Sequence, residues 1–208
     1  MRGAREGRER KRRTQAERSA TTRTRLLDAA VECLLELGYG RTTTIEVAKR
    51  AGLSRGAQLH HFPSKAELMT AAVERVFTRR QDEFMRAFGK LPASADPASS
   101  AIDLLWSIIG DRSFFAWLEL VIASRTEPDL LAHVSALTLR FDAEVERTFR
   151  ELFTPAEPAG PLFHFAPRLA FLLLEGLALR RALVPKGPDV EEALSGLKML
   201  FGAAIKGG

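Results

Sequence analysis

The fold is decided by the stretch TTTIEVAKRAGLSRGAQLHHF, residues 42–62, which predicts two short helices joined by a tight turn. Thr43 is followed three residues later by Glu46, the spacing of a capping box at a helix start. Gly52 readily adopts the left-handed backbone that ends a helix, and Ser54 is a good N-cap for the next one. Such a pair is a helix-turn-helix, whose second helix enters the major groove of DNA.

The second helix of this motif carries the side chains that we expect to reach base edges. Arg55 can hold guanine N7 and O6 with its guanidinium, and Gln58, if it points outward, can pair with adenine. Gly56 and Ala57 are small and permit close approach to the groove wall. The predicted base-reading residues are Thr44, Arg55, Gly56, Ala57, Gln58 and Leu59. Alternatively, Gln58 and Leu59 only pack against or solvate the helix.

The residues around this motif resemble the N-terminal domain of TetR-family transcriptional regulators, over about residues 20–75. The shared motifs are Gly38-Tyr39, Thr42-Thr43, Val47-Ala48, Ala51-Gly52-Leu53-Ser54, His60-His61-Phe62-Pro63-Ser64-Lys65 and Glu67-Leu68. One departure concerns Gln58 and Leu59, which stand where the family usually has an apolar residue and then tyrosine. Either an aromatic DNA contact is lost here, or a slight turn of the helix gives Gln58 the readout role.

Phosphate contacts are expected on both sides of the recognition helix. The resemblance implies them for four residues, namely Thr43, His60, His61 and Lys65. Arg23 and Arg25 lie in the first turn of the preceding helix and would also face the phosphates. Such contacts orient a recognition helix without reading sequence. His60 and His61 are poor metal candidates, because adjacent helical residues diverge and no third ligand is near.

The positive charge gathers at the N-terminal end. Residues 1–25 hold ten Arg or Lys against three Glu, whereas the whole chain carries a formal net charge of +5. Residues 1–18 are therefore predicted to form a basic flexible arm that follows phosphates or enters the minor groove, although a solvated tail is the plainer alternative.

Composition narrows the class of protein. A chain of 208 residues with 46% apolar residues can bury ample core. The single Cys33 excludes an internal disulfide and fits a reducing cytoplasm. No signal peptide opens the chain, and the longest apolar run, residues 169–179, is too short to span a membrane. We expect no metal and no cofactor.

The remaining chain is predicted to be all-α, with about nine or ten helices in total. The predicted helices are about 22–37, the motif pair, 64–89, 99–109, 113–124, 130–153, 166–184 and 189–205. We predict three segments: the arm (1–18), a helix-turn-helix domain (19–78) and a helical body (79–208). The long helix from Ser64 to Gly89 would connect head and body.

The resemblance implies that the body binds a small effector and forms a homodimer. An aromatic-rich, mostly apolar cavity would suit a small hydrophobic ligand, although ordinary core is the alternative for each residue. The predicted lining residues are Trp106, Trp117, Arg125, His133 and Phe141. The predicted dimer residues are Leu169, Leu173, Gly176, Leu177, Leu194, Leu197 and Phe201, with internal packing of most of this face as the alternative. Glu175 lies in this apolar run and would need a partner if buried, such as Arg180 or Arg181 of the same chain or of the other subunit.

The prediction for function is a cytoplasmic, homodimeric regulator that binds a palindromic operator on double-stranded DNA as a ligand-responsive repressor. An architectural DNA-binding protein without an effector is the first alternative, and strong binding to random DNA with a steep salt dependence would favour it. An enzyme that uses the body's cavity is the second. The sequence contains no Gly-x-Ser-x-Gly, phosphate-binding glycine loop or His-Glu-x-x-His motif, so we expect no catalysis.

Overall fold

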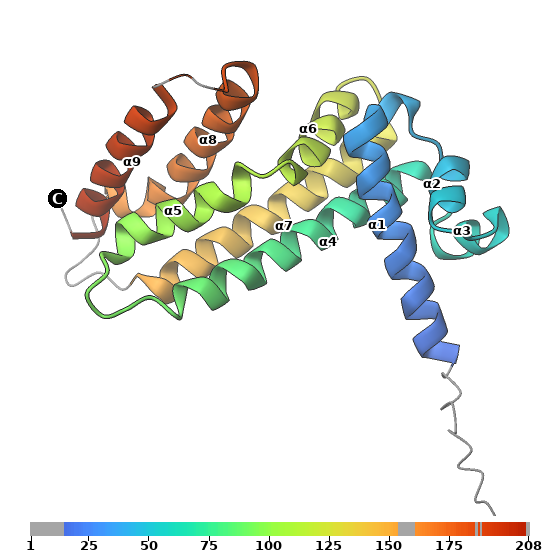
Figure 1. The fold of residues 1–208 in the computed structure, drawn as a ribbon, viewed down its shortest axis with the longest axis horizontal. Helices are drawn as coiled ribbons and strands as arrows, with labels where there is room; N and C mark the ends of the chain where they lie inside the picture. Colours follow the sequence, from blue (N-terminus) through green and yellow to red (C-terminus); the bar gives the residue numbers. More distant parts are fainter. Residues whose placement is uncertain (1–14, 154–160, 186, 188, 207–208) are drawn as a thin grey trace, which may run out of the picture.

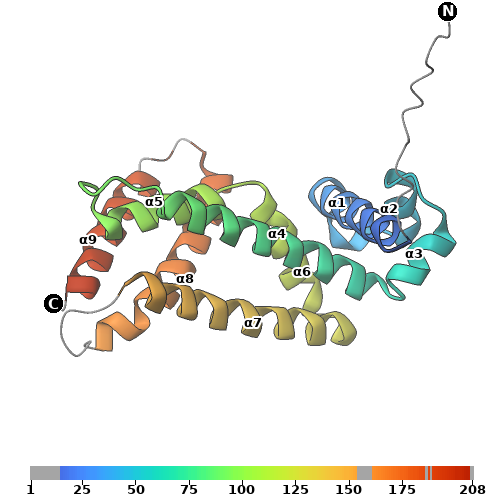
Figure 2. The same cartoon turned by 90° about the horizontal axis from the view of Figure 1, so that it is seen from below.

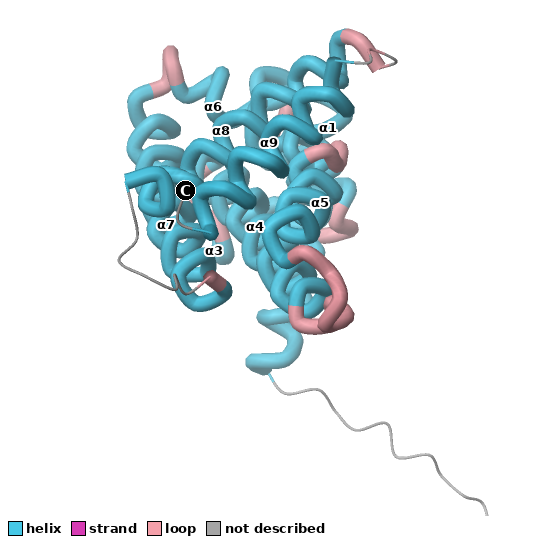
Figure 3. Tube along the Cα trace, turned by 90° about the vertical axis from the view of Figure 1, so that its left-hand side faces the viewer, coloured by secondary structure: helices cyan, strands magenta, loops and turns pink. Residues whose placement is uncertain are grey.

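The computed structural model describes residues 15–153, 161–185, 187 and 189–206, and within them the chain consists of nine α-helices and their connections (Figure 1). The helices are α1 (Gln15–Arg41), α2 (Thr44–Arg50), α3 (Arg55–His61), α4 (Lys65–Phe88), α5 (Pro97–Ile109), α6 (Ser113–Ser124), α7 (Pro128–Leu152), α8 (Pro161–Leu183) and α9 (Asp189–Lys206). Seen from the end that carries α8 and α9, the described chain is again helix and loop only (Figure 3). The all-α prediction is confirmed.

The first helix differs most from its predicted bounds. It begins at Gln15, so the end of the predicted flexible arm is helical, and the rest of the arm, residues 1–14, lies outside the described residues. Gly38 has φ +70°, which kinks α1 at the residue where the sequence predicts its end. The chain then continues to Arg41, and the Thr42 hydroxyl donates a 2.7 Å hydrogen bond to the Gly38 carbonyl.

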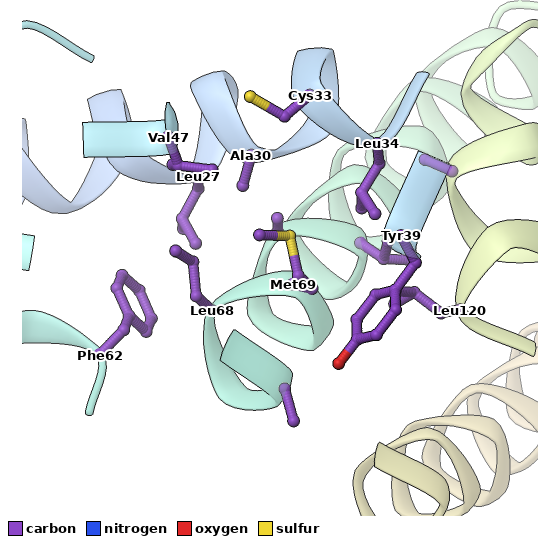
Figure 4. Packing of buried hydrophobic residues seen from close by; sticks show 14 of the residues in the cluster. Leu27, Ala30, Cys33, Leu34, Tyr39, Val47, Phe62, Leu68, Met69 and Leu120 are labelled. Carbon is purple, nitrogen blue, oxygen red and sulfur yellow. The ribbon is translucent and has the colours of Figure 1, made fainter. Parts of the chain in front are cut away.

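The head consists of α1, α2, α3 and the start of α4, which pack around one apolar core (Figure 4). Leu26, Phe62, Leu68 and Met69 have no measurable exposure, so this core is closed. Cys33 lies in the same core and is fully buried. Burial of these side chains fixes the orientation of the two short motif helices, which could not be stable alone.

The long helix α4 joins the head to the body. It lies beside α7 along the length of the molecule, with α1–α3 at one end and α8 and α9 at the other (Figures 1 and 2). The predicted domain boundary at residue 78 falls inside α4, which runs on without a break. Helix α6 lies between α1 and α7, so α4 and α6 both contact head and body.

A second core fills the body between α4, α5, α7, α8 and α9. Its centre is aromatic, because Phe149 and Phe153 from the end of α7 meet Phe163 of α8 and Phe201 of α9. Among the described residues, no helix is long and apolar enough to cross a membrane.

Candidate DNA-binding surface and interior cavity

The backbone of the helix-turn-helix has the predicted local geometry. The Thr43 hydroxyl accepts a 3.1 Å hydrogen bond from the Glu46 amide at the start of α2. Gly52 has φ +64°, the left-handed conformation that its lack of a Cβ permits. The Ser54 hydroxyl accepts a 3.2 Å bond from the Ala57 amide and so caps α3. These local interactions fix where the recognition helix begins.

Five of the six residues predicted to read bases have accessible side chains or backbone. Arg55 and Gly56 are exposed at the first turn of α3, and Leu59 is exposed one turn later. Thr44 and Ala57 are partly exposed. An exposed leucine at this place is notable, because it presents an apolar surface where a thymine methyl group could be contacted.

The structure corrects the prediction for Gln58. Its side chain has no measurable exposure, and Nε2 donates a 2.7 Å hydrogen bond to the Phe62 carbonyl. Gln58 therefore closes the end of α3 from the inside and cannot reach a base edge. Helix α3 is rotated so that its second turn offers Leu59, not Gln58, to the surface.

Lys65, which was predicted to contact a phosphate, makes contacts within the chain. Its Nζ donates a 2.7 Å hydrogen bond to the Tyr39 carbonyl and lies 3.9 Å from the centre of the Tyr39 ring. Burial lowers the pKa of Lys65. The amine thus joins α4 to the end of α1.

The other residues predicted to contact phosphates stay near the surface. The Arg23 guanidinium lies 4.5 Å from the centre of the Phe62 ring, and Arg25 packs beside Gly52, so these two arginines of α1 reach the motif. Their side chains remain largely exposed, as do those of Thr43 and His60.

His61 differs from its neighbour His60. It is partly exposed, and burial, followed by the nearby His60 and Arg23, lowers the pKa of its imidazole. At neutral pH this residue therefore offers a neutral ring. A phosphate contact would use an N–H hydrogen bond from the ring, not a full positive charge.

A cavity of about 490 Å³ lies in the body, with most of its wall contributed by α4, α5, α6, α7 and α8. Of the predicted lining residues, Trp117 and Phe141 line it. Two rings that the sequence analysis did not select, Phe77 of α4 and Phe171 of α8, lie against them. A cavity of this size is typical of a site for a small organic molecule.

Three residues predicted to line the cavity lie elsewhere. Trp106 stacks under the Arg181 guanidinium, which is 4.4 Å from its ring centre. Arg125 is the exposed C-cap of α6. His133 is exposed on α7. None of the three lines the cavity, because Trp106 packs against the body's core and Arg125 and His133 lie on exposed faces of their helices.

Glu175 was the carboxylate predicted to need a partner, and it lines the cavity. Neither candidate partner is available within the chain, because Arg180 is paired with Asp189 and Arg181 donates to the Gly110 carbonyl. Burial, and then the charge of Asp142, raise the pKa of Glu175. It has no hydrogen-bond or ion-pair partner among the described residues.

The outer faces of α8 and α9 expose large apolar side chains. They include Leu169, Leu172, Leu173, Leu183, Met199 and Leu200. Of the predicted dimer residues, Gly176 is exposed too, whereas Leu177 and Leu194 are partly buried. Leu197 and Phe201 are corrections, since both are buried in the core of their own chain. The exposed apolar side chains of α9 are instead Met199 and Leu200, which lie between them in the sequence.

A direct contact links the body to the kink in α1. Oε2 of Glu119, on α6, accepts a 2.9 Å hydrogen bond from the Tyr39 amide. The same carboxylate lies against Gly38, where a Cβ would come within 2.7 Å of it. Trp117 on the same helix faces the cavity, so α6 contacts both the cavity and the base of the head.

The short capped helix pair and its exposed recognition helix define a helix-turn-helix DNA-binding regulator. The family model described as "Bacterial regulatory proteins, tetR family" matches residues 26–72. An uncharacterised HTH-type transcriptional regulator of Mycobacterium tuberculosis is 29% identical over 182 residues, which is 86% of this chain and 92% of that protein. The HTH-type transcriptional regulator CymR of Pseudomonas putida is 37% identical over 120 residues, covering 58% of this chain and 59% of CymR.

Solved structures share the whole fold at low sequence identity. A member of the TetR family from Streptomyces coelicolor is 23% identical, with a TM-score of 0.63 over 86% of this chain and 97% of that one. The multidrug binding protein EbrR, in complex with imidazole, is 22% identical, with a TM-score of 0.62 over 86% and 93%. A protein of Saccharomonospora viridis, in complex with choline, is 18% identical, with a TM-score of 0.62 over 86% and 95%. This chain belongs to the TetR family of DNA-binding transcriptional regulators, a non-enzymatic family.

Proposed function

We propose that this chain is a ligand-responsive repressor that binds a palindromic operator as a homodimer and releases it when a small molecule enters the cavity. The observation that carries the proposal is the shared use of α4 and α6. Both helices line the cavity, and both pack against α1 of the head. A ligand that favours a different position of these helices therefore favours a different position of the head.

In this proposal, each recognition helix enters one major groove of the operator. Arg55, at the exposed start of α3, holds a guanine, and Leu59 contacts a thymine methyl group. The small residues Gly56 and Ala57 allow close approach, and Thr44 adds a contact from α2. Phosphates on either side are bound by Arg23, Arg25, Thr43, His60 and His61.

The proposed dimer places the exposed faces of α8 and α9 against their copies in a second chain. Two apolar helices from each chain would form a four-helix bundle around a twofold axis. In such a dimer the two recognition helices must lie about 34 Å apart to enter successive major grooves. A ligand that favours another spacing shifts the population away from DNA, and a tenfold loss of operator affinity needs about 1.4 kcal/mol of differential binding.

Effector binding is supported by the cavity itself and by relatives with the same fold. EbrR is a multidrug binding protein solved with imidazole, and the Saccharomonospora viridis protein was solved with choline. The cavity of this chain has the volume and the aromatic walls that a comparable small organic molecule would require.

Retention of genomic DNA fragments by the purified protein at physiological salt tests the proposal. We expect one enriched palindrome with half-sites about one helical turn apart. Broad retention without a motif would contradict the proposal and favour the architectural alternative, especially if the affinity fell steeply with salt.

The dimer can be tested separately with Leu173→Asp, which puts a carboxylate into the exposed face of α8. We expect a monomer in sedimentation and an operator affinity reduced about tenfold or more, because an unpaired charge would be buried in the interface. Leu139→Asp is the matched control, since Leu139 is exposed on α7, outside the proposed interface. A dimeric Leu173→Asp protein would contradict the proposed interface.

A further inference from the structure

We propose that the effector is a lipophilic organic cation, whose positive charge lies beside Glu175 and whose apolar body lies among four aromatic rings of the cavity. This inference rests on the effector-binding function proposed above and adds the chemical class of the ligand. It also departs from the expectation, made from composition, of a merely hydrophobic ligand.

The four rings form a continuous row across the cavity. Trp117 of α6 meets Phe77 of α4 with ring centres 5.4 Å apart, and Phe77 meets Phe141 of α7 at 4.6 Å. Phe141 then meets Phe171 of α8 at 5.4 Å. All four residues line the cavity. Aromatic faces attract organic cations through their quadrupoles, and they attract them more strongly where water is excluded.

The row of rings ends at a carboxylate. Glu175 follows Phe171 by four residues on α8, so the two side chains lie on the same face of that helix, one turn apart. Both line the cavity, and Asp142, next to Phe141 on α7, lines it as well. The carboxylates therefore gather at the α7–α8 end of the aromatic row.

The charges of the described lining residues leave one carboxylate without a counter-charge. Arg80 is held between Glu83 and Asp111, at 2.9 and 2.8 Å. Arg168, the other basic residue of the lining, lies 3.8 Å from Asp142. Both arginines already face carboxylates, which offset the positive charge that they would offer to an anionic ligand.

The other two carboxylates of the lining are also paired. Glu144 accepts hydrogen bonds from Gln81 and Arg147, and Glu146 is bound by Arg150. That leaves Glu175, which has no such partner among the described residues. A carboxylate in an apolar wall is disfavoured as an anion unless a positive charge lies near it. A bound cation would supply that charge, whereas a neutral ligand would leave it missing and an anion would be repelled.

Three ligands with the same biphenyl body and different charges test the proposal. They are 4-phenylbenzyltrimethylammonium, 4-biphenylmethanol and biphenyl-4-carboxylate, each measured by isothermal titration calorimetry with the full chain. The quaternary ammonium is charged at every pH, so its protonation does not complicate the comparison. We expect the cation to bind about tenfold or more tightly than the alcohol, as a charge-assisted contact implies, and the carboxylate to bind least.

Two variants test whether Glu175 causes the preference for the cation over the alcohol. Glu175→Gln keeps the shape of the side chain and should remove most of the preference for the cation over the alcohol. Glu151→Gln is the control, because it removes the same charge from α7 at an exposed residue outside the lining. It should leave the preference unchanged. Thermal unfolding of both variants checks that they are folded.

Each remaining outcome counts against the proposal in a distinguishable way. If the alcohol or the carboxylate binds wild-type protein as tightly as the cation, the ligand class is wrong but the effector-binding function stands. A preference that survives Glu175→Gln would overturn the role of that carboxylate. If none of the three ligands binds at millimolar concentration, and none weakens binding to the retained DNA, both the ligand class and the proposed effector function fail.

Discussion

The head and the body of this molecule use their apolar residues differently. In the head, Leu26, Phe62, Leu68 and Met69 are fully buried in one closed core. In the body, a cavity of about 490 Å³ remains between the helices, and the outer faces of α8 and α9 expose several leucines. The head is thus closed within one chain, whereas the body keeps apolar side chains exposed on its surface and around its cavity.

This difference follows from what each region must bind. DNA presents a constant backbone geometry, so a rigid recognition helix held by a closed core is sufficient for binding it. In the proposed function, an effector and a second chain are bound through apolar surface that must stay available until they arrive. The contact between Glu119 and the Tyr39 amide joins the two regions at the kink of α1.

The largest effect on stability is expected from truncating a phenylalanine in the core of the head, compared with one in the cavity wall of the body. Phe62→Ala in the closed core should lower the free energy of unfolding by about 3–5 kcal/mol, because it leaves a cavity among side chains with no room to adjust. Phe141→Ala should cost less than about half as much, since one side of Phe141 already faces the cavity. Urea denaturation measures both. Equal losses would show that the body is packed as tightly as the head.

A second prediction concerns the surface of the head. Arg55→Ala should weaken operator binding by about 1–3 kcal/mol and relax the preference at one base pair. Arg79→Ala is the control, because Arg79 is exposed on α4 and pairs only with Glu83. Fluorescence anisotropy with operator and random DNA distinguishes a base-reading role of Arg55 from a phosphate contact. An equal loss on both DNAs would make Arg55 a phosphate contact.

A third prediction concerns the interior of the recognition helix. Gln58→Met conserves volume but removes the hydrogen bond to the Phe62 carbonyl, and it should cost about 1–2 kcal/mol of stability. The operator preference should stay the same at every base pair, because the side chain does not reach the DNA. Binding to a set of single-base operator variants checks this. A changed preference at one position would restore the readout role that the sequence suggested.

The smallest effect concerns the cavity wall and depends on pH. The pKa of Glu175 is raised above its ordinary value of 4.5, so the folded protein disfavours ionisation of this carboxyl. The protein therefore loses stability as the pH rises above 4.5. Glu175→Gln removes this loss. The variant should therefore have a higher melting temperature than wild type at pH 7 and an equal one near pH 4. A wild type that gains stability relative to the variant between these values would contradict the raised pKa.

Local interactions explain which parts of the molecule could be predicted from sequence. Thr43, Ser54 and Ser64 each accept an amide hydrogen bond from a residue three positions on, so the starts of α2, α3 and α4 depend only on neighbours in the chain. Gly38 and Gly52 have the positive φ that their positions suggested. Helix α6 has the predicted bounds too, although its N-cap residue, Arg112, makes no capping side-chain hydrogen bond.

Tertiary packing explains what could not be predicted. Helix α3 is only seven residues long, and its rotation about its axis depends on how it packs against Phe62. The local sequence therefore does not show that Gln58 is on the buried side. Helical spacing likewise marks two apolar stripes on α9 without saying which faces its own chain. The structure buries Leu197 and exposes Leu200. Trp106 and His133 were misplaced because the inward face of a helix is set by its neighbours.

The single cysteine of the chain gives the head a built-in reporter of its own opening. Cys33 is fully buried at the centre of the head, and burial raises the pKa of its thiol. A maleimide reagent can then react only when the head opens locally, so the labelling rate measures how often that happens. Because the chain contains one cysteine, no mutation is needed to make the label specific. The same rate, taken with and without DNA or ligand, would follow the rigidity of the DNA-binding region in the unmodified protein.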